Sequence, residues 1–309
     1  MGVPSNTFLT TAAIGNREDL SDVIYRISPI QTPFISMAAK AKASNTLHEW
    51  QTQDLAPAVT TNAAAEGDNP TAKVVTPTVR LNNRTQISQK TVVVSGTEQA
   101  MNPAGRKNEL AYQMTLSSQE LKRDMESSAT QLDVLATSPR QSRGLLGWVV
   151  DNSSNGGGAY VAANYINNTG QTNGTLRSYQ ETQLKAVAQL VYTAGGDPDV
   201  LMMPPALTQT FSTFTGNSTR MDKGEDQTLF ASVSVYVSDF GKLKAVPNRF
   251  MRTRDVFLLE MDKWAIAYLR PFTTQELAKA GDNETRQILA EWCVEARAPK
   301  ANGSIFDVQ

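Results

Sequence analysis

The sequence predicts an α+β fold, because helical and strand-like patterns occupy separate stretches of the 309 residues instead of alternating. Residues 46–96 lack a helical period and are rich in β-branched side chains. Residues 102–136 carry the longest helical pattern, and short strand patterns dominate residues 232–297. A chain of this length exceeds the usual size of one compact domain, so we expect two domains or one core with long extensions.

The composition supports a real core and argues against several function classes. Apolar residues make up 40% of the chain, and the net charge is -1 with Lys and Arg spread along the sequence. Tight nucleic-acid binding needs a basic patch, so we do not expect it. We also expect no signal peptide and no membrane-spanning segment, because no run of about 18 apolar residues occurs. The single cysteine fits folding in a reducing cytoplasm.

The first 45 residues are expected to form an arm. Asn16 is a candidate cap for a short helix whose apolar residues fall on one face, and Pro29 and Pro33 end it. The chain after this helix is therefore predicted to be extended.

Residues 46–96 predict a long two-stranded antiparallel hairpin. The run from Glu66 to Pro70 is a strong turn signal between two strand-like flanks. Residues 56–78 contain few large apolar side chains, and an isolated hairpin is marginal in water. We therefore expect this hairpin to rest on a neighbouring molecule.

The long helix is predicted over residues 102–136, about eight to ten turns. Pro103 is tolerated in the first turn, and Pro139 ends the helix. Its apolar stripe is narrow, so much of its circumference should be wet. The stripe consists of Leu110, Met114, Leu121, Met125 and Leu132.

The remaining elements are shorter. Residues 151–174 are rich in Asn, Gly and Ser and predict a flexible loop, and residues 179–194 predict an amphipathic helix that ends at Gly195. Strands are predicted at residues 200–203, 232–238, 243–246, 255–259, 264–269 and 287–297.

Candidate catalytic and metal-binding groups are scarce. His48 is the only histidine and Cys293 the only cysteine, which leaves no zinc pattern. Both lie in strand-like contexts beside aromatic residues, where packing is the default role. The three glycines at 156–158 lack the Gly-Lys-Ser/Thr of a phosphate loop, and the acidic residues at 222–226 lack the ladder of a calcium loop. We therefore expect no enzyme activity, cofactor or metal.

The run Gly15-Asn16-Arg17-Glu18-Asp19-Leu20 and a set of further short motifs together resemble a tailed-bacteriophage major head protein family with the Hong Kong 97 capsid fold. The similarity begins with Gly15-Asn16-Arg17-Glu18-Asp19-Leu20 and extends to about residue 300. The order and spacing of the motifs carry it. They lie at residues 15–25, 27–29, 32–34, 47–52, 105–107, 110–112, 120–126, 194–198, 211–216, 236–241, 246–250, 268–271 and 276–279.

The resemblance implies a division of the chain into the parts of that fold. These are an N-terminal arm (1–45), an extended E-loop (46–96), a P-domain with its spine helix (97–144), an A-domain (145–250), and P-domain return strands with the C-terminus (251–309).

It further implies a structural protein that self-assembles as hexamers and pentamers into an icosahedral head, made in the bacterial host cytoplasm, around double-stranded DNA that is not bound sequence-specifically. A separate scaffolding protein and a portal protein are the expected partners, and a decoration protein is an optional one. Lys73 and Asn283 are not identified as an isopeptide pair, so we expect no covalent crosslink.

Six charged residues are the candidates for contacts between subunits, and solvated surface charges are the alternative for each. The candidates are Glu66, Asp68, Arg80, Arg84, Arg106 and Lys107.

Three alternative functions remain open from the residues alone. The nearest is an encapsulin-like compartment that encloses cargo. The second is a hydrolase that uses Cys293 and His48. The third is a carbohydrate-binding module, which would need Trp50, Trp148, Trp264 and Trp292 on an exposed face.

Overall fold

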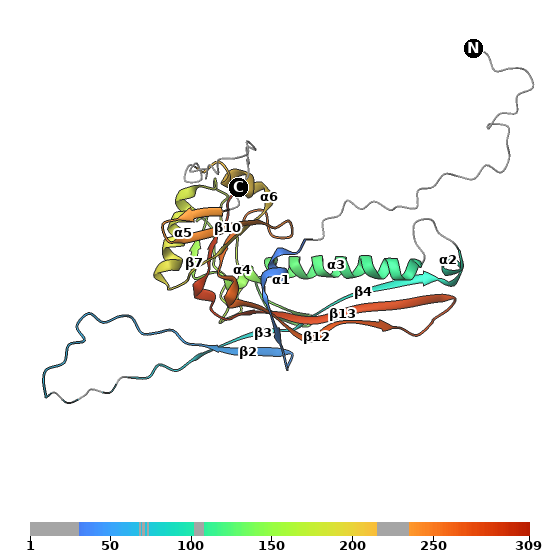
Figure 1. Ribbon diagram of the computed structural model, residues 1–309, viewed down its shortest axis with the longest axis horizontal. Coiled ribbons are helices and arrows are strands. Elements are labelled where there is room, and N and C mark those ends of the chain that lie inside the picture. Colours follow the sequence, from blue (N-terminus) through green and yellow to red (C-terminus); the bar gives the residue numbers. More distant parts are fainter. Residues whose placement is uncertain (1–30, 68, 70–71, 73, 102–107, 215–234) are drawn as a thin grey trace, which may run out of the picture.

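The computed structural model describes residues 31–67, 69, 72, 74–101, 108–214 and 235–309. Two sheets organise this part of the chain, and a hairpin projects away from both (Figure 1). The helix predicted after Asn16 lies outside the described residues. No helix within the described ranges is both long and apolar enough to cross a membrane.

The first sheet is four-stranded, in the order β1-β12-β13-β4. Strand β1 runs parallel to β12, and the other neighbours are antiparallel. Strands β12 and β13 are longer than predicted, because they pair with each other over most of their length. The bounds are β1 Ala39–Lys42, β4 Gln86–Ser95, β12 Trp264–Glu276 and β13 Asn283–Ala296.

The long helix α3 (Glu109–Gln131) lies along this sheet, preceded by α1 (Pro33–Met37) and α2 (Gly96–Ala100) (Figure 1). Its N-cap is Asn108, whose side chain accepts a 2.9 Å hydrogen bond from the Ala111 N–H. The predicted start at residues 102–107 lies outside the described residues.

The predicted end of α3 is wrong, because the helix stops at Gln131 and its 23 residues make about six turns. The next residue, Leu132, is extended, and its carbonyl accepts the Gly144 N–H at 2.9 Å. This contact belongs to a sharp reversal that contains the short pair β5 (Ala136–Thr137) and β6 (Arg140–Gln141).

The hairpin is shorter than predicted from residues 46–96. Strands β2 (Leu47–Thr52) and β3 (Val79–Arg84) pair antiparallel over six residues each. Strand β4 follows after one residue, Thr85, but pairs with β13 instead. The second flank therefore contains two strands that belong to different sheets.

The second sheet is six-stranded, in the order β7-β14-β11-β8-β10-β9. The helix predicted at 179–194 is present as α5 and ends before Gly195, whose φ of 89° favours glycine. The bounds are α4 Leu145–Trp148, β7 Asn152–Ser154, α5 Glu181–Thr193, β8 Val200–Met203, α6 Pro205–Phe211, β9 Val235–Ser238, β10 Gly241–Pro247, β11 Val256–Leu259 and β14 Gly303–Ile305, with 3-10 turns at Met261–Lys263 and Pro299–Ala301.

Residues 251–309, predicted as one group of return strands, are divided between the two sheets. Strands β12 and β13 complete the four-stranded sheet, whereas β11 and β14 lie inside the six-stranded one. Strand β11 is paired on both sides, and all four of its residues are buried because apolar side chains cover both faces of the sheet here. The chain therefore crosses between the sheets several times, which ties them together.

The region at 151–174 is more ordered than its composition predicts. It contains β7, which pairs parallel with β14, and the isolated bridges Val161↔Thr172 and Asn164↔Thr169. Backbone pairing thus replaces the apolar contacts that the sequence lacks here.

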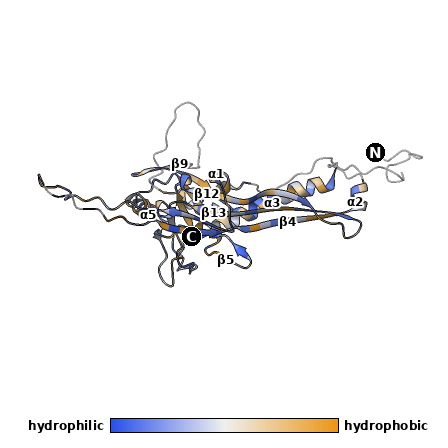
Figure 2. Ribbon diagram, turned by 90° about the horizontal axis from the view of Figure 1, so that it is seen from below, coloured by the Kyte–Doolittle hydropathy of each residue, from blue (hydrophilic) through white to orange (hydrophobic). Residues whose placement is uncertain are grey.

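Two large apolar clusters form most of the core, beside a small third one that contains Cys293. The larger lies at the junction of the two sheets and α3 and includes the fully buried Trp148, Trp264 and Trp292. The smaller of the two lies between α5, α6 and one face of the six-stranded sheet. In the view of Figure 2, the hairpin and the α2 end of the four-stranded sheet extend in opposite directions from this central body.

Candidate functional site

The root of the hairpin is fixed firmly to the body of the molecule. Trp50 Nε1 donates a 2.8 Å hydrogen bond to the Ala296 carbonyl, and the His48 ring lies 3.1 Å from the Glu295 carboxylate. On the paired strand, Asn83 Nδ2 donates to the Val294 carbonyl at 2.7 Å and to the Arg143 carbonyl at 2.9 Å. The direction in which the hairpin leaves the body is therefore set by buried contacts.

Beyond this root the hairpin has no strand pairing in the described residues and packs against little of its own chain. Four of its aliphatic side chains stand in solvent. Their exposed fractions are 97% for Leu55, 67% for Val59, 86% for Val74 and 82% for Val75. Exposed apolar side chains gathered on one projecting segment mark an interaction surface.

The three predicted contact residues that the structure describes lie at opposite ends of this hairpin. Glu66 is exposed at the tip, in a turn where Gly67 has a φ of 82°. Arg80 and Arg84 lie at the root; Arg80 is exposed and lies 3.6 Å from Glu49. Arg84 is half-buried and its Nε has no hydrogen-bond partner among the described residues. Asp68, Arg106 and Lys107 lie outside the described residues.

A buried ionic cluster, which the sequence did not reveal, sits where the hairpin joins the four-stranded sheet. Thr85 Oγ1 donates to Glu291 at 2.9 Å, and Arg140 and Arg270 pair with the same carboxylate at 2.7 and 2.8 Å. Burial by itself would raise the pKa of Glu291, but the bonds from Thr85 and Arg270 and the two positive charges lower that pKa. Thr85, the residue between β3 and β4, is thus fixed by hydrogen bonds to two charged side chains, Glu291 of β13 and Arg140 of β6.

A second buried carboxylate joins the arm, the long helix and the six-stranded sheet. Glu126 of α3 is fully buried and accepts the backbone N–H groups of Phe34 and Ile35 at 2.8 and 2.9 Å. It also accepts from Asn248 Nδ2 at 2.7 Å. Burial raises the pKa of Glu126, although these three bonds act in the opposite direction.

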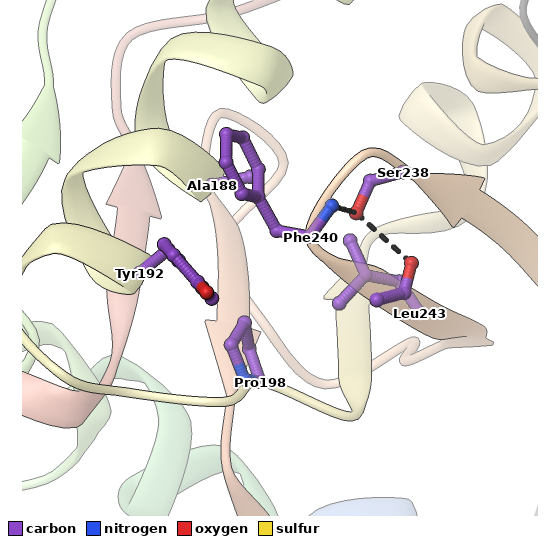
Figure 3. A pocket seen from close by; sticks show the side chains of 7 residues that line it. Ala188, Tyr192, Pro198, Ser238, Phe240 and Leu243 are labelled. Carbon is purple, nitrogen blue, oxygen red and sulfur yellow. Dashed lines mark hydrogen bonds between the residues drawn. The ribbon is translucent and has the colours of Figure 1, made fainter.

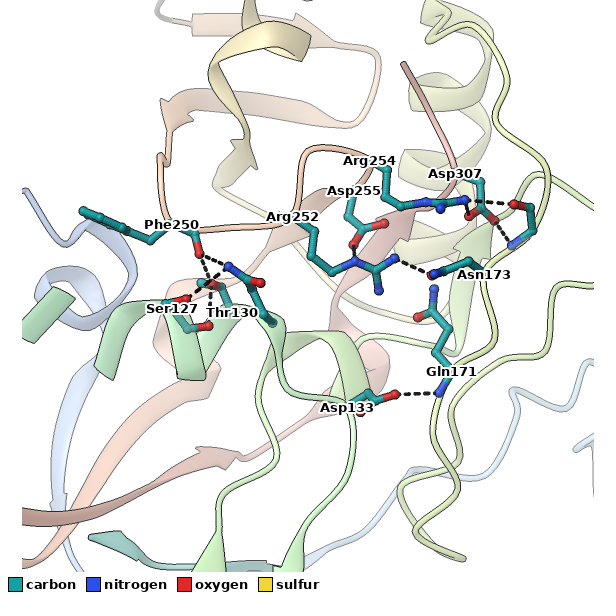
Figure 4. A network of polar contacts seen from close by, with 12 residues as sticks. Ser127, Thr130, Asp133, Gln171, Asn173, Phe250, Arg252, Arg254, Asp255 and Asp307 are labelled. Carbon is teal, nitrogen blue, oxygen red and sulfur yellow. Dashed lines mark hydrogen bonds and ion pairs between the residues drawn. The ribbon is translucent and has the colours of Figure 1, made fainter. Parts of the chain in front are cut away.

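A third polar cluster anchors the C-terminal residues (Figure 4). Asp307 is buried, pairs with Arg254 and accepts the Gly174 N–H at 3.0 Å. Asp255 is buried 3.1 Å from Arg252 Nε. Burial and the nearby Asp307 charge raise the pKa of Asp255 to about 7, against the effect of Arg252.

An aromatic pair lies at the β9 end of the six-stranded sheet (Figure 3). The rings of Tyr192 and Phe240 lie 5.0 Å apart, one from α5 and one from the turn between β9 and β10. Ser238 Oγ holds this turn by accepting the Phe240 N–H at 3.3 Å and donating to the Gly241 carbonyl at 2.9 Å.

A cleft of about 600 Å³ lies beside the hairpin root. Its walls include Tyr165, Arg297 and the ion pair between Lys300 and Asp54. The cations that line it already have acidic partners, so the cleft presents no concentrated charge to a ligand.

The geometry does not support a Cys293 nucleophile. Cys293 is fully buried between alanines, and burial together with the Glu295 charge raises the pKa of the thiol to about 12. A nucleophilic cysteine needs a lowered pKa and an adjacent base. The only histidine is engaged with Glu295 instead.

The tryptophans do not form a binding platform. Trp148, Trp264 and Trp292 are fully buried, and Trp50 packs on Trp148 with ring centroids 5.4 Å apart. These side chains pack in the core, so the exposed aromatic face that a carbohydrate-binding module needs is not formed by them.

Comparison with known proteins identifies a family and a fold. The family model of the SU10 major capsid protein matches residues 4–309. The major capsid protein of Escherichia phage Phieco32 is 30% identical over 340 aligned positions, which cover 94% of each chain.

Solved structures share the fold at low identity. The cyanophage A-1(L) capsid has a TM-score of 0.65 at 13% identity, with 97% of this chain and 98% of that chain covered. The capsid of a native GTA particle has a TM-score of 0.67 at 10% identity, with the same coverage. Phage G major capsid and decoration proteins give 0.58 at 9% identity over the full length of both chains. The α+β fold and the resemblance to phage capsid proteins are thereby confirmed.

Proposed function

The chain belongs to the SU10 major capsid protein family, and from this membership and its geometry we propose that it self-assembles as hexamers and pentamers into the icosahedral head of a tailed phage. The shell encloses double-stranded DNA. Assembly takes place in the bacterial host cytoplasm, and the finished protein resides in the virion. Each chain makes repeated heterologous contacts, so stability comes from their number.

The hairpin is the observation that supports this function most directly. Its root is fixed by hydrogen bonds to the body of the molecule, while Leu55, Val74 and Val75 project into solvent. Such a segment gains stability only when a neighbouring surface covers it. A neighbouring subunit supplies that surface in a shell.

The chain is assigned to the parts of the capsid fold as follows. Residues 1–45 form the arm, 46–96 the E-loop, 97–144 the P-domain with the spine helix α3, and 145–250 the A-domain. Residues 251–309 carry the return strands, of which β12 and β13 belong beside α3 and β11 and β14 beside α5.

Partners beyond the subunit itself are a scaffolding protein, a portal protein and, optionally, a decoration protein. Glu66, Asp68, Arg80, Arg84, Arg106 and Lys107 are proposed as contacts between subunits.

We propose no catalytic role and no covalent crosslink. The curated relative is a phage capsid protein, which favours a DNA-containing head over an encapsulin-like compartment. Purified particles should therefore contain DNA and a portal instead of cargo enzymes.

Shortening the hairpin tests this function. A variant in which an Asn-Gly turn replaces residues 55–76 keeps the anchors at Trp50 and Asn83. We expect its subunit to fold normally but to form no closed shells, as measured by sedimentation and electron microscopy. Shells at the wild-type yield would contradict the role of the hairpin.

A further inference from the structure

Among the described residues, nothing covers one face of the six-stranded sheet at its β9 end, and this face is both apolar and basic. Strand β9 is the last in the sheet, and its Val235 and Val237 are 48% and 64% exposed on either side of the buried Tyr236. In the antiparallel pair with β10, Lys244 lies opposite Val235 and Lys242 opposite Val237. Residues paired in this way project from the same face. Val235, Val237, Lys242 and Lys244 are called the basic face below.

The other face of the same end, toward α5, is aromatic and acidic. Tyr192 and Phe240 are 59% and 37% exposed and pack against each other (Figure 3). Asp239, which precedes Phe240, is exposed, and so is Asp197, which lies beside Gly241. Tyr192, Asp197, Asp239 and Phe240 are called the acidic face below.

One further ion pair on α5 does not alter this charge. Lys185 pairs with Glu181 at 2.9 Å, so the two charges offset each other. The acidic face therefore keeps the charge of its two aspartates.

We infer that the basic face of one subunit docks on the acidic face of a second copy, and that this head-to-tail contact closes the rings of the shell. The inference rests on the proposed function and names the surface that performs it. Two lysines meet two aspartates, and two valines meet an aromatic pair, so charge and apolar area are complementary. Because the two faces are different surfaces of the same chain, the contact is heterologous and repeats by rotation.

Charge exchange tests the pairing. The variants are K242E/K244E, D197K/D239K and the combination of all four substitutions. All four side chains are exposed, so each variant should keep the wild-type circular dichroism spectrum and unfolding midpoint. We expect each double variant to lower the assembled fraction at least about tenfold, and the combined variant to restore it, measured by sedimentation velocity in low salt.

The apolar half is tested by V237D. Val237 is largely exposed in the subunit, so its replacement should leave the unfolding midpoint unchanged and still reduce assembly. Residues 215–234 of the same chain are the other candidate cover for the basic face. Amide exchange at β9 that is as slow in the free subunit as in assembled particles would assign the face to the same chain and overturn the inference.

The outcomes separate this inference from the proposed function. If the wild-type protein assembles but either double variant assembles equally well, the function stands and the inference is wrong. A combined variant that is folded but not restored would also refute the pairing of the two faces. If the wild-type protein forms no ring or shell under any condition, both the function and the inference fail.

Discussion

Glu126 and Asn248 lie 122 residues apart in the sequence, yet the carboxylate of the first accepts a 2.7 Å hydrogen bond from the side-chain amide of the second. The same carboxylate accepts two backbone N–H groups at the start of α1. One buried side chain thus connects the end of the arm, the long helix and the segment after β10. Displacement of any one of these elements therefore strains the hydrogen bonds that Glu126 makes with the others.

Replacement of Glu126 tests this junction. In Glu126→Ala, two buried donors and one partly buried donor lose their acceptor, and a cavity forms beside α3. We expect a loss of about 3–5 kcal/mol in the free energy of unfolding, measured by denaturant titration with tryptophan fluorescence. Glu120→Ala is the matched control on the same helix, because its side chain is 53% exposed, and it should cost less than about 1 kcal/mol. Equal effects would refute the junction.

The Asp255 cluster predicts a pH dependence of stability. Its pKa is raised in the folded state, to about 7 from 3.8, so the folded protein holds a proton that the unfolded chain has released between these pH values. The contribution of Asp255 is therefore unfavourable above pH 7 and is relieved as the pH falls toward 4. A rise from 3.8 to about 7 corresponds to at most about 4 kcal/mol.

The measurement is the free energy of unfolding at pH 8 and pH 5 for the wild type and for Asp255→Asn. The neutral amide carries no titrating proton, so the difference between the two pH values should be smaller in the variant. An identical pH dependence in both proteins would show that Asp255 does not titrate in this range.

The Glu291 cluster predicts that the hairpin loosens when its charge is removed. Glu291→Ala leaves Arg140 and Arg270 without their shared partner, and we expect a cost of about 2–4 kcal/mol. Because the pKa of Glu291 is lowered, its contribution is present above the unfolded pKa and is lost as the pH falls through the folded pKa. Hydrogen exchange at β2 and β3 should become faster in the variant. Unchanged exchange there would disconnect the cluster from the hairpin.

A charge reversal at Arg80 should affect particle assembly without a matching effect on subunit stability. Its pair with Glu49 is 3.6 Å long and solvent-exposed, so Arg80→Glu should change the free energy of unfolding by less than about 1 kcal/mol. We nevertheless expect a lower yield of particles, because we propose that Arg80 contacts a neighbouring subunit. The same reversal at Arg84 should act likewise, with a larger effect on stability because this side chain is half-buried. Particle yield equal to the wild type for both variants would remove these residues from the contact.

Local patterns predicted most of the elements but few of the contacts between them. The helix that ends at Gly195 and the strand Val200–Met203 were found because capping and apolar runs act over a few residues. The end of α3 was misplaced because Leu132 is extended by a contact with Gly144, which no local pattern encodes.

Of the candidate contact surface, the exposed hairpin was predicted from the sequence, whereas the buried clusters that fix its root and the adjoining elements were not. The exposed hairpin followed from its turn signal and its lack of large apolar residues. The Glu126 and Glu291 clusters were not predicted, because they join residues far apart in the sequence. Glu126 contacts Phe34, 92 positions away, and Glu291 contacts Thr85, 206 positions away. A glutamate in a helical or strand pattern is predicted to be a solvated surface charge, because its burial depends on tertiary contacts that the local sequence does not show.

The central claim, that this chain builds a closed shell, is tested most directly by negative-stain electron microscopy with sedimentation of the purified protein, expressed alone and with a candidate scaffolding protein. Closed particles, or rings of five and six subunits, are the predicted result. A compact protein that stays monomeric under every assembly condition would contradict the account.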